Sequence, residues 1–432
     1  MSKKQLIDIK QENKQKTAIL ISVMKQKDSE YEINRSLDEL CRLAETAEIV
    51  VFDKCFQKRE KPDPATYVGL GFLNEIKAKA IENDIDLLIF DNELTPAQIA
   101  HIEKKHDLQV IDRTELILNI FYKHAKTNEA RLEIRLAELH YEKPRLRNNS
   151  SGLDRLGGAS GGAVGLAARG SGETKLELDK RSIEKEIMNI KQALKKIEIQ
   201  KETQAKMRST TKKVCLVGYT NAGKSTLFNT LTDSDVYVKD QLFATLTSTS
   251  RQLNLFPSCE VVLSDTVGFI SKLPHQLVAS FNATLKEVKD ADLLLHVVDI
   301  SDKDYDTYIN EVNKVLHGIG VAETPTLLVF NKIDKCDFNI DFILKQFAEN
   351  TIPISAANKI NVDTLKNTIK SSLFITQEYK LYIPFSEQKL IANLHEKVLI
   401  VSKEFDENGI VLVIQANVDC RSEFEKWTTF SD

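Results

Sequence analysis

The stretch Gly218-Tyr219-Thr220-Asn221-Ala222-Gly223-Lys224-Ser225 lies between the apolar run Val214–Val217 and a segment of helical pattern that reaches Leu231. Turn-forming residues between a strand and a helix let successive backbone N–H groups point inward, and the helix N-terminus adds partial positive charge. This arrangement predicts a loop that binds a polyphosphate. We expect the Lys224 ammonium to reach the β- and γ-phosphates and the Ser225 hydroxyl to bind Mg²⁺.

The composition is that of a globular protein, with 432 residues of which 42% are hydrophobic and 28% charged. No apolar run approaches the roughly 18 residues that a membrane span needs, and Met1–Gln5 lacks a signal-peptide core. We therefore expect a cytoplasmic protein without stable membrane insertion, with peripheral association left open. The 6 cysteines are scattered without a C-x-x-C pair, which favours buried free thiols over zinc or disulfides.

Residues 1–142 have the pattern of an α/β domain. Short apolar runs alternate with stretches of helical spacing, and this alternation predicts a parallel sheet. The expected strands are Ala18–Val23, Ile49–Phe52, Leu87–Phe90 and Val110–Ile111. From Thr114 to Tyr141 the pattern is helical, and this stretch is expected to supply the first helix of a hairpin.

The segment 143–211 combines glycine with basic charge. Residues 152–172 contain half of the 16 glycines of the chain. A loop so rich in glycine is either a flexible linker or a backbone-rich surface that orders against RNA phosphates. From Lys143 to Lys213 there are 17 Lys and Arg against 8 Asp and Glu, a balance of +9 in a chain of net charge −4. This asymmetry favours a polyanionic partner.

A second helix is expected after the glycine-rich loop. Apolar residues recur there at intervals of three and four, at Ile183, Ile187, Ile190, Leu194 and Ile197. This spacing predicts one apolar stripe and a basic outer face. We expect the stripe to pack against the helical stretch 114–141, completing the hairpin, rather than to bind another protein.

Residues 212–374 have the pattern of a nucleotide-binding domain. The expected strands are Val214–Val217, Val261–Leu263, Leu293–Val298, Thr326–Phe330 and Ile352–Ile354. Their alternation with helical stretches predicts a doubly wound sheet with its ligand at the carboxyl ends of the strands. Residues 375–432 are expected to form a small α+β module, with a strand, a helix near Leu394 and two strands around Asn408-Gly409, packed on the nucleotide domain.

Two further motifs predict which nucleotide base the site binds. Asn331-Lys332-Ile333-Asp334 follows an expected strand, and the Asp334 carboxylate can accept from both N1–H and the exocyclic amine of guanine. Adenine would leave this carboxylate buried and unpaired, which disfavours ATP. Ser355-Ala356-Ala357 follows the next expected strand, and we expect its backbone N–H groups to reach the guanine O6. Together these motifs predict GTP as the substrate.

Two segments between these motifs are expected to sense the γ-phosphate. In Asp265-Thr266-Val267-Gly268 the Asp265 carboxylate would hold the Mg²⁺ shell through water, and the Gly268 N–H would bond the γ-phosphate. Thr245 lies in a polar stretch, and its hydroxyl is the candidate second protein ligand of Mg²⁺. Lys224, Thr245 and Gly268 are therefore the predicted catalytic residues, and Ser225 and Thr245 the predicted metal ligands. The remaining predicted GTP-binding residues of this stretch are Phe243, Ala244, Leu246 and Thr247.

Phe269 stands where Ras-like enzymes have the glutamine that orients the attacking water. A phenyl ring can neither donate nor accept that hydrogen bond. Hydrolysis by the free protein should therefore be slow, and a polyanionic partner should raise turnover at least about tenfold, an order that partner-supplied groups reach in related enzymes.

The chain resembles the HflX family of ribosome-associated GTPases over about residues 15–415. The resemblance rests on Asp112–Glu115 with Ile120–Ala125, the loop that ends in Arg169–Glu177, the phosphate loop, Leu242–Leu246 and Asp265–Ile270. The expected fold class is α/β, a P-loop GTPase domain with an N-terminal α/β domain plus helical hairpin and a small C-terminal α+β module. The expected domains are 1–142, 143–211, 212–374 and 375–432.

The resemblance implies binding to the large ribosomal subunit, through ribosomal RNA and proteins, and dissociation of stalled or stressed ribosomes. We place the basic segment 143–213 against ribosomal RNA and expect a monomer that binds GTP and GDP. Two other functions remain open at this point: a GTPase that checks large-subunit assembly, and a regulatory switch that acts on a protein.

Overall fold

The computed structural model describes residues 16–106, 108–125, 127–148, 165–206, 211–232, 249–257, 259–266, 268–272, 282–336, 343, 345–347, 351–387, 394, 398–406 and 408–428. These residues form two compact units. The first runs to Glu202 and also includes Lys272 and Asn282, and the second holds the other described residues from Thr203 onward. Among the described residues, no helix combines the length and the apolar character needed to cross a membrane.

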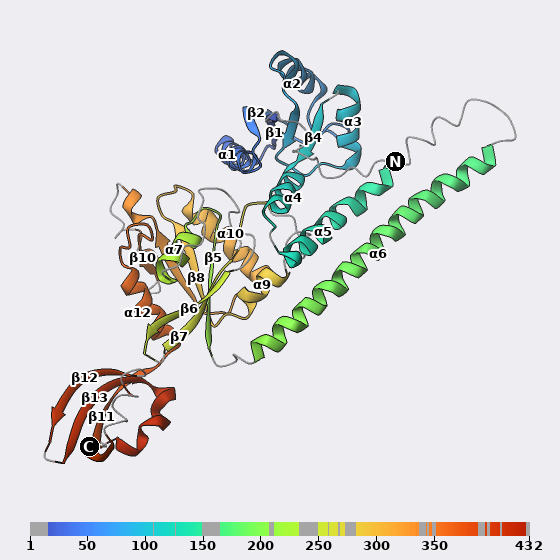
Figure 1. The fold of residues 1–432 in the computed structure, drawn as a ribbon. Coiled ribbons are helices and arrows are strands. Elements are labelled where there is room, and N and C mark those ends of the chain that lie inside the picture. The colour runs from blue at the N-terminus through green and yellow to red at the C-terminus, as the bar shows by residue number, and fades with distance from the viewer. Residues whose placement is uncertain are drawn as a thin grey trace. The chain divides into compact units, whose positions relative to one another are not determined.

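The first unit contains a four-stranded parallel sheet of order β2-β1-β3-β4 (Figure 1). Its strands are β1 (Thr17–Met24), β2 (Val50–Lys58), β3 (Leu87–Phe90) and β4 (Gln109–Asp112). Helices α1 (Glu30–Thr46), α2 (Leu70–Glu82) and α3 (Pro96–His106) connect them. Every residue of β3 is buried, as expected of a strand covered on both faces. All four predicted strands are present.

The predicted helical stretch 114–141 is two helices, α4 (Arg113–His124) and α5 (Asn128–Glu142). Ala125 is extended, and the Thr127 hydroxyl accepts from the Ala130 N–H at 3.2 Å, so a new helix begins there. The helical pattern is thus confirmed over most of this stretch, and local capping divides it into two helices.

The helix that follows α5, α6 (Gly165–Lys206), lies along it (Figure 1). Leu136 and Leu139 of α5 pack against Ile187 and Ile190 of α6 in one buried cluster. The predicted hairpin is thus confirmed. The predicted loop 152–172 was wrong for 165–172, which begin α6, because glycine costs only about 1 kcal/mol in a helix that the following residues support. Residues 149–164 lie outside the described ones.

The second unit contains a six-stranded sheet of order β10-β9-β8-β5-β7-β6. The predicted strands are β5 (Lys212–Gly218), β7 (Cys259–Asp265), β8 (Leu293–Asp299), β9 (Thr326–Asn331) and β10 (Thr351–Pro353), all parallel. The sheet also has an antiparallel edge strand that the sequence did not reveal, β6 (Thr249–Phe256), whose side chains are mostly exposed or half-buried. The helices described here are α7 (Lys224–Thr232), α9 (Asn282–Lys289), α10 (Tyr305–Gly318) and α12 (Val362–Leu373).

A three-stranded antiparallel sheet of order β11-β13-β12 follows α12. Its strands are β11 (Thr376–Pro384), β12 (Leu399–Phe405) and β13 (Gly409–Asn417), and they have a core of their own around Leu381, Leu412 and Phe424. The predicted helix between the first two strands falls mostly outside the described residues, although Leu394 is helical.

Candidate functional site

The phosphate loop lies where the order of the second sheet reverses. Strand β5 has β7 on one side and β8 on the other, so the carboxyl end of β5 opens at the point where a doubly wound sheet binds its ligand. Gly223 has a φ of +92°, and a side chain there would meet the Asn331 amide. The loop therefore requires glycine at this position.

The Lys224 ammonium is almost fully enclosed by the loop. It donates to the carbonyls of Gly218 at 3.1 Å and Tyr219 at 2.8 Å. Burial lowers the pKa of Lys224 to about 8, although Asp265 opposes that fall. An anionic phosphate beside this ammonium would favour its charged form.

Two residues are placed to serve a divalent cation. The Ser225 hydroxyl donates to Asp265 Oδ2 at 2.7 Å, and Asp265 Oδ1 is buried with no hydrogen-bond partner among the described residues. Burial raises the pKa of Asp265, while Lys224 and Ser225 lower it. An unsatisfied carboxylate oxygen beside a hydroxyl fits a hydrated Mg²⁺, which prefers few protein ligands together with water and phosphate. In the described part of the chain, no cluster of three His, Cys, Asp or Glu could hold a metal by itself.

The segment after Asp265 is bonded to the phosphate loop. The Phe269 N–H donates to Gly218 O at 3.1 Å, and Phe269 O accepts from the Thr220 N–H at 2.8 Å. A Cβ on Gly268 would lie 2.9 Å from Lys224 Nζ and from Thr220 Cα. The predicted γ-phosphate donor thus lies directly beside the lysine, in a space that admits only glycine.

The predicted base-binding motifs converge on Asn331. Its side-chain amide donates to Ala222 O at 2.9 Å, and its amide oxygen accepts from the Ala356 N–H at 3.0 Å. The Asn331 side chain therefore connects the phosphate loop to Ser355-Ala356-Ala357 by two hydrogen bonds. The Ala356 N–H, expected at the guanine O6, is bonded to Asn331 in this structure.

Asp334 receives a hydrogen bond from Ser355 Oγ at 2.5 Å. Contrary to our expectation of a buried carboxylate, Asp334 is exposed in the protein itself. A base bound there would cover it, so the energetic argument for guanine applies to the complex.

Lys332 has a partner that the sequence did not single out. Its ammonium donates to Asn221 O at 2.8 Å and pairs with Asp299 at 2.7 Å. Asp299 ends β8, and its place at the carboxyl end of a parallel strand is the signal that could have found it.

Some predicted site residues cannot be placed. The predicted site residues that the structure describes lie near one another at the carboxyl ends of the strands of the second sheet. They are residues 218–225, 265–266, 268, 331–334 and 355–357. The following predicted site residues lie outside the described ones: Phe243, Ala244, Thr245, Leu246, Thr247 and Val267.

Comparison with known proteins agrees with this geometry. Family models match three consecutive regions: "GTP-binding GTPase N-terminal" at residues 34–122, "GTP-binding GTPase Middle Region" at 124–208 and "50S ribosome-binding GTPase" at 213–332. GTPase HflX of Caldanaerobacter subterraneus is 42% identical over 406 residues, which cover 93% of this chain and 91% of that protein. The chain belongs to the HflX family of GTPases. The predicted family and fold class are confirmed, and the protein hydrolyses GTP.

A second HflX relative matches a shorter part of the chain. GTPase HflX of Flavobacterium psychrophilum is 46% identical over 316 residues, 73% of this chain and 75% of that protein. Among solved structures, the crystal structure of SsGBP and GDP complex is similar at 27% identity, with a TM-score of 0.47, over 82% of this chain and 98% of that one.

Proposed function

We propose that this protein is a cytoplasmic GTPase that binds the large ribosomal subunit and uses GTP binding and hydrolysis to dissociate stalled or stressed ribosomes. The observation that carries the nucleotide part is the convergence of Lys224, Ser225, Asp265 and Gly268 at one end of a site whose other end holds Asn331 and Asp334. The model that matches residues 213–332 is described as a 50S ribosome-binding GTPase, which supports the partner.

Each end of the site has a separate task in this proposal. Lys224 and the loop amides bind the phosphates, and the Gly268 N–H bonds the γ-phosphate as charge moves during hydrolysis. Ser225 and Thr245 would hold Mg²⁺, which would supply positive charge to offset that of the phosphates. Asp334 selects guanine.

Phe269 supports slow turnover by the free protein. Its side chain is buried, and its backbone is engaged by Gly218 and Thr220. A ring held in this way cannot orient a water molecule. We therefore expect a ribosomal partner to supply the missing group or to order the site, with a rise in turnover of at least about tenfold.

The basic face of α6 supports an RNA partner. Six cationic side chains of this helix are exposed, at Lys180, Arg181, Lys185, Lys191, Lys195 and Lys196. Arg181 is paired with Glu177, and Ile187 and Ile190 of the same helix pack against α5, so the exposed lysines are the side chains that can reach phosphates.

Sedimentation tests this function. Purified protein is mixed with intact ribosomes and either a non-hydrolysable GTP analogue or GDP, and the particles are separated on a sucrose gradient. A shift toward free subunits with the analogue, and not with GDP, supports the proposal. A parallel gradient uses precursors of the large subunit: binding to these particles alone would favour a role in assembly, and no cosedimentation with either kind of particle would refute a ribosomal function.

A further inference from the structure

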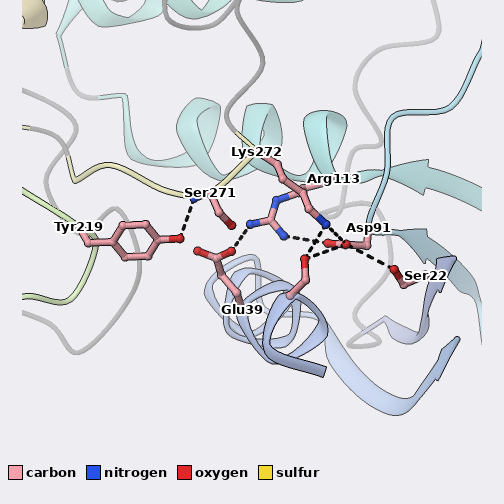
Figure 2. A network of polar contacts seen from close by, with 8 residues as sticks. Ser22, Glu39, Asp91, Arg113, Tyr219, Ser271 and Lys272 are labelled. Carbon is pink, nitrogen blue, oxygen red and sulfur yellow. Dashed lines mark hydrogen bonds and ion pairs between the residues drawn. The ribbon is translucent and has the colours of Figure 1, made fainter. Parts of the chain in front are cut away.

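The second residue of the phosphate loop, Tyr219, has a buried aromatic side chain. Its hydroxyl accepts a hydrogen bond from the Ser271 N–H at 2.7 Å, as Figure 2 shows. Its backbone carbonyl accepts from the Lys224 ammonium at 2.8 Å. Tyr219 therefore connects the lysine of the loop with the chain that follows Gly268. Phosphate binding uses the backbone of the loop and Lys224, so the phenol is left without an assigned task.

The ring of Tyr219 is held by a second tyrosine. It stacks on Tyr308 of α10, with the ring centroids 4.2 Å apart and the ring planes 25° apart. Aromatic pairs prefer particular geometries, so the stack restricts the orientation of the ring. α10 is in turn fixed to the sheet, because Ile309 packs with Val298 of β8 and Phe330 of β9 in one buried cluster. The Tyr219 hydroxyl is therefore presented from a rigid setting.

The Tyr219 hydroxyl makes the second of two attachments between the phosphate loop and the segment 268–271. The first is the pair of backbone hydrogen bonds described above, which join Phe269 to the loop. Each residue has only two soft backbone dihedrals. A chain fixed at Phe269 and again at Ser271 therefore has little freedom to turn about the first attachment. The direction of the neighbouring Gly268 N–H is set by the same restraint.

Every residue of this arrangement belongs to the second compact unit. The next residue, Lys272, belongs to the first unit, where its ammonium and the Arg113 guanidinium both donate to Asp91 (Figure 2). The attachment of Ser271 to Tyr219 is thus complete within one unit and needs no group from the N-terminal sheet.

We propose that Tyr219, held by Tyr308, is a positioning residue for GTP hydrolysis. Its hydroxyl fixes the segment 268–271 against the phosphate loop and so keeps the Gly268 N–H beside Lys224, where charge develops on the γ-phosphate. The proposal rests on the role given to Gly268 above. The phenol acts through the backbone of this segment and contacts no phosphate itself.

The test uses the full-length protein without ribosomes and the variant Tyr219→Phe, which keeps the stacked ring and removes the hydroxyl. We expect kcat to fall about fivefold, because the γ-phosphate donor loses its fixed position. The affinity for a non-hydrolysable GTP analogue should fall as well. GDP affinity should stay within about twofold, because GDP lacks the phosphate that Gly268 contacts. Hydrolysis assays and titrations with fluorescent nucleotides measure these quantities.

Variants of α10 separate positioning from general damage. Tyr308→Leu removes the stacked ring and should reproduce the Tyr219→Phe defect, whereas Tyr308→Phe keeps the ring and should retain most of the rate. Tyr305→Phe is the matched control: it removes a hydroxyl from the same helix, on a ring that packs against Phe330, and should change neither rate nor affinity. Combining Tyr219→Phe with Tyr308→Leu should be no worse than the more affected single variant, because both act on the same attachment.

An unchanged kcat in Tyr219→Phe would overturn the proposal. A loss of GDP affinity equal to that for the analogue would overturn it too, because the phenol would then shape the phosphate loop as a whole. Failure of the wild-type protein to bind either nucleotide would instead refute the nucleotide site itself.

Discussion

At the scale of single residues, the proposed selection of guanine depends on one carboxylate, that of Asp334. Ser355 fixes Asp334 by a hydrogen bond, and the side chain is otherwise open to solvent. A carboxylate in this position accepts two hydrogen bonds from guanine and none from adenine. Selection therefore depends on the chemistry of this side chain more than on the shape of the site.

Asp334→Asn should weaken GDP binding by about 100-fold or more and favour xanthosine diphosphate, since an amide can donate to the xanthine C2 oxygen. Calorimetric titration with both nucleotides measures the change. Unaltered preference for guanine in this variant would exclude Asp334 as the selecting residue.

We expect Lys224 to make nucleotide binding depend on pH. Only the ammonium form attracts phosphate, and its pKa is lowered to about 8 by burial. The charged fraction falls as pH rises through that value, so GDP affinity should drop about fourfold between about pH 7 and about pH 8.5. Fluorescence titration with labelled GDP checks this. Lys224→Arg stays charged over the range and should bind with no such drop, even if more weakly.

At the scale of elements, the hairpin of α5 and α6 depends on a small apolar seam. Leu139 is fully buried between the two helices, and Ile187 and Ile190 face it from α6. The ion pairs that flank the seam, such as Arg135 with Glu186, are partly exposed and contribute little. Apolar burial is therefore what holds α6 against α5.

Leu139→Ala should lower the free energy of unfolding of this hairpin by about 3 kcal/mol, through lost burial and the cavity that remains. Hydrogen exchange should then accelerate in residues 183–197 of α6. Leu178→Ala removes an exposed leucine of the same helix and serves as the control. Equal exchange in the two variants would mean that the seam does not hold α6.

At the scale of the whole molecule, the two compact units have separate cores. One core surrounds Ile19, Leu88 and Phe90, and another surrounds Leu216, Leu263 and Leu295. Lys224 and Asn331 belong to the second unit. A nucleotide bound there raises the stability of the second unit by its binding free energy. It raises the stability of the first unit only if the unfolding of the two units is coupled.

Calorimetric heating should show two transitions, with GDP and Mg²⁺ at about 100 times the dissociation constant raising one of them by about 5 to 10 °C. The transition that moves should also be the one abolished by destabilising the β5 core, for example with Leu216→Ala. Two transitions that rise together by the same amount would show that the units do not unfold independently.

The sequence by itself determined the phosphate loop, the guanine motifs, the strands of both parallel sheets and the hairpin stripe of α6. These are local signals, because turn chemistry and hydrophobic period act over a few residues. It did not reveal β6, the break between α4 and α5, or the helical start of α6, where capping and neighbouring structure outweigh local pattern.

Only the tertiary structure brought Lys272 to Asp91, which is 181 residues away along the chain. Neither residue belongs to a recognisable motif, and a lysine in a turn has the appearance of a solvated surface residue. The pairing exists because β3 ends at a buried carboxylate that needs a second cation. Such a requirement is set by burial and distance, and neither is a property of sequence alone.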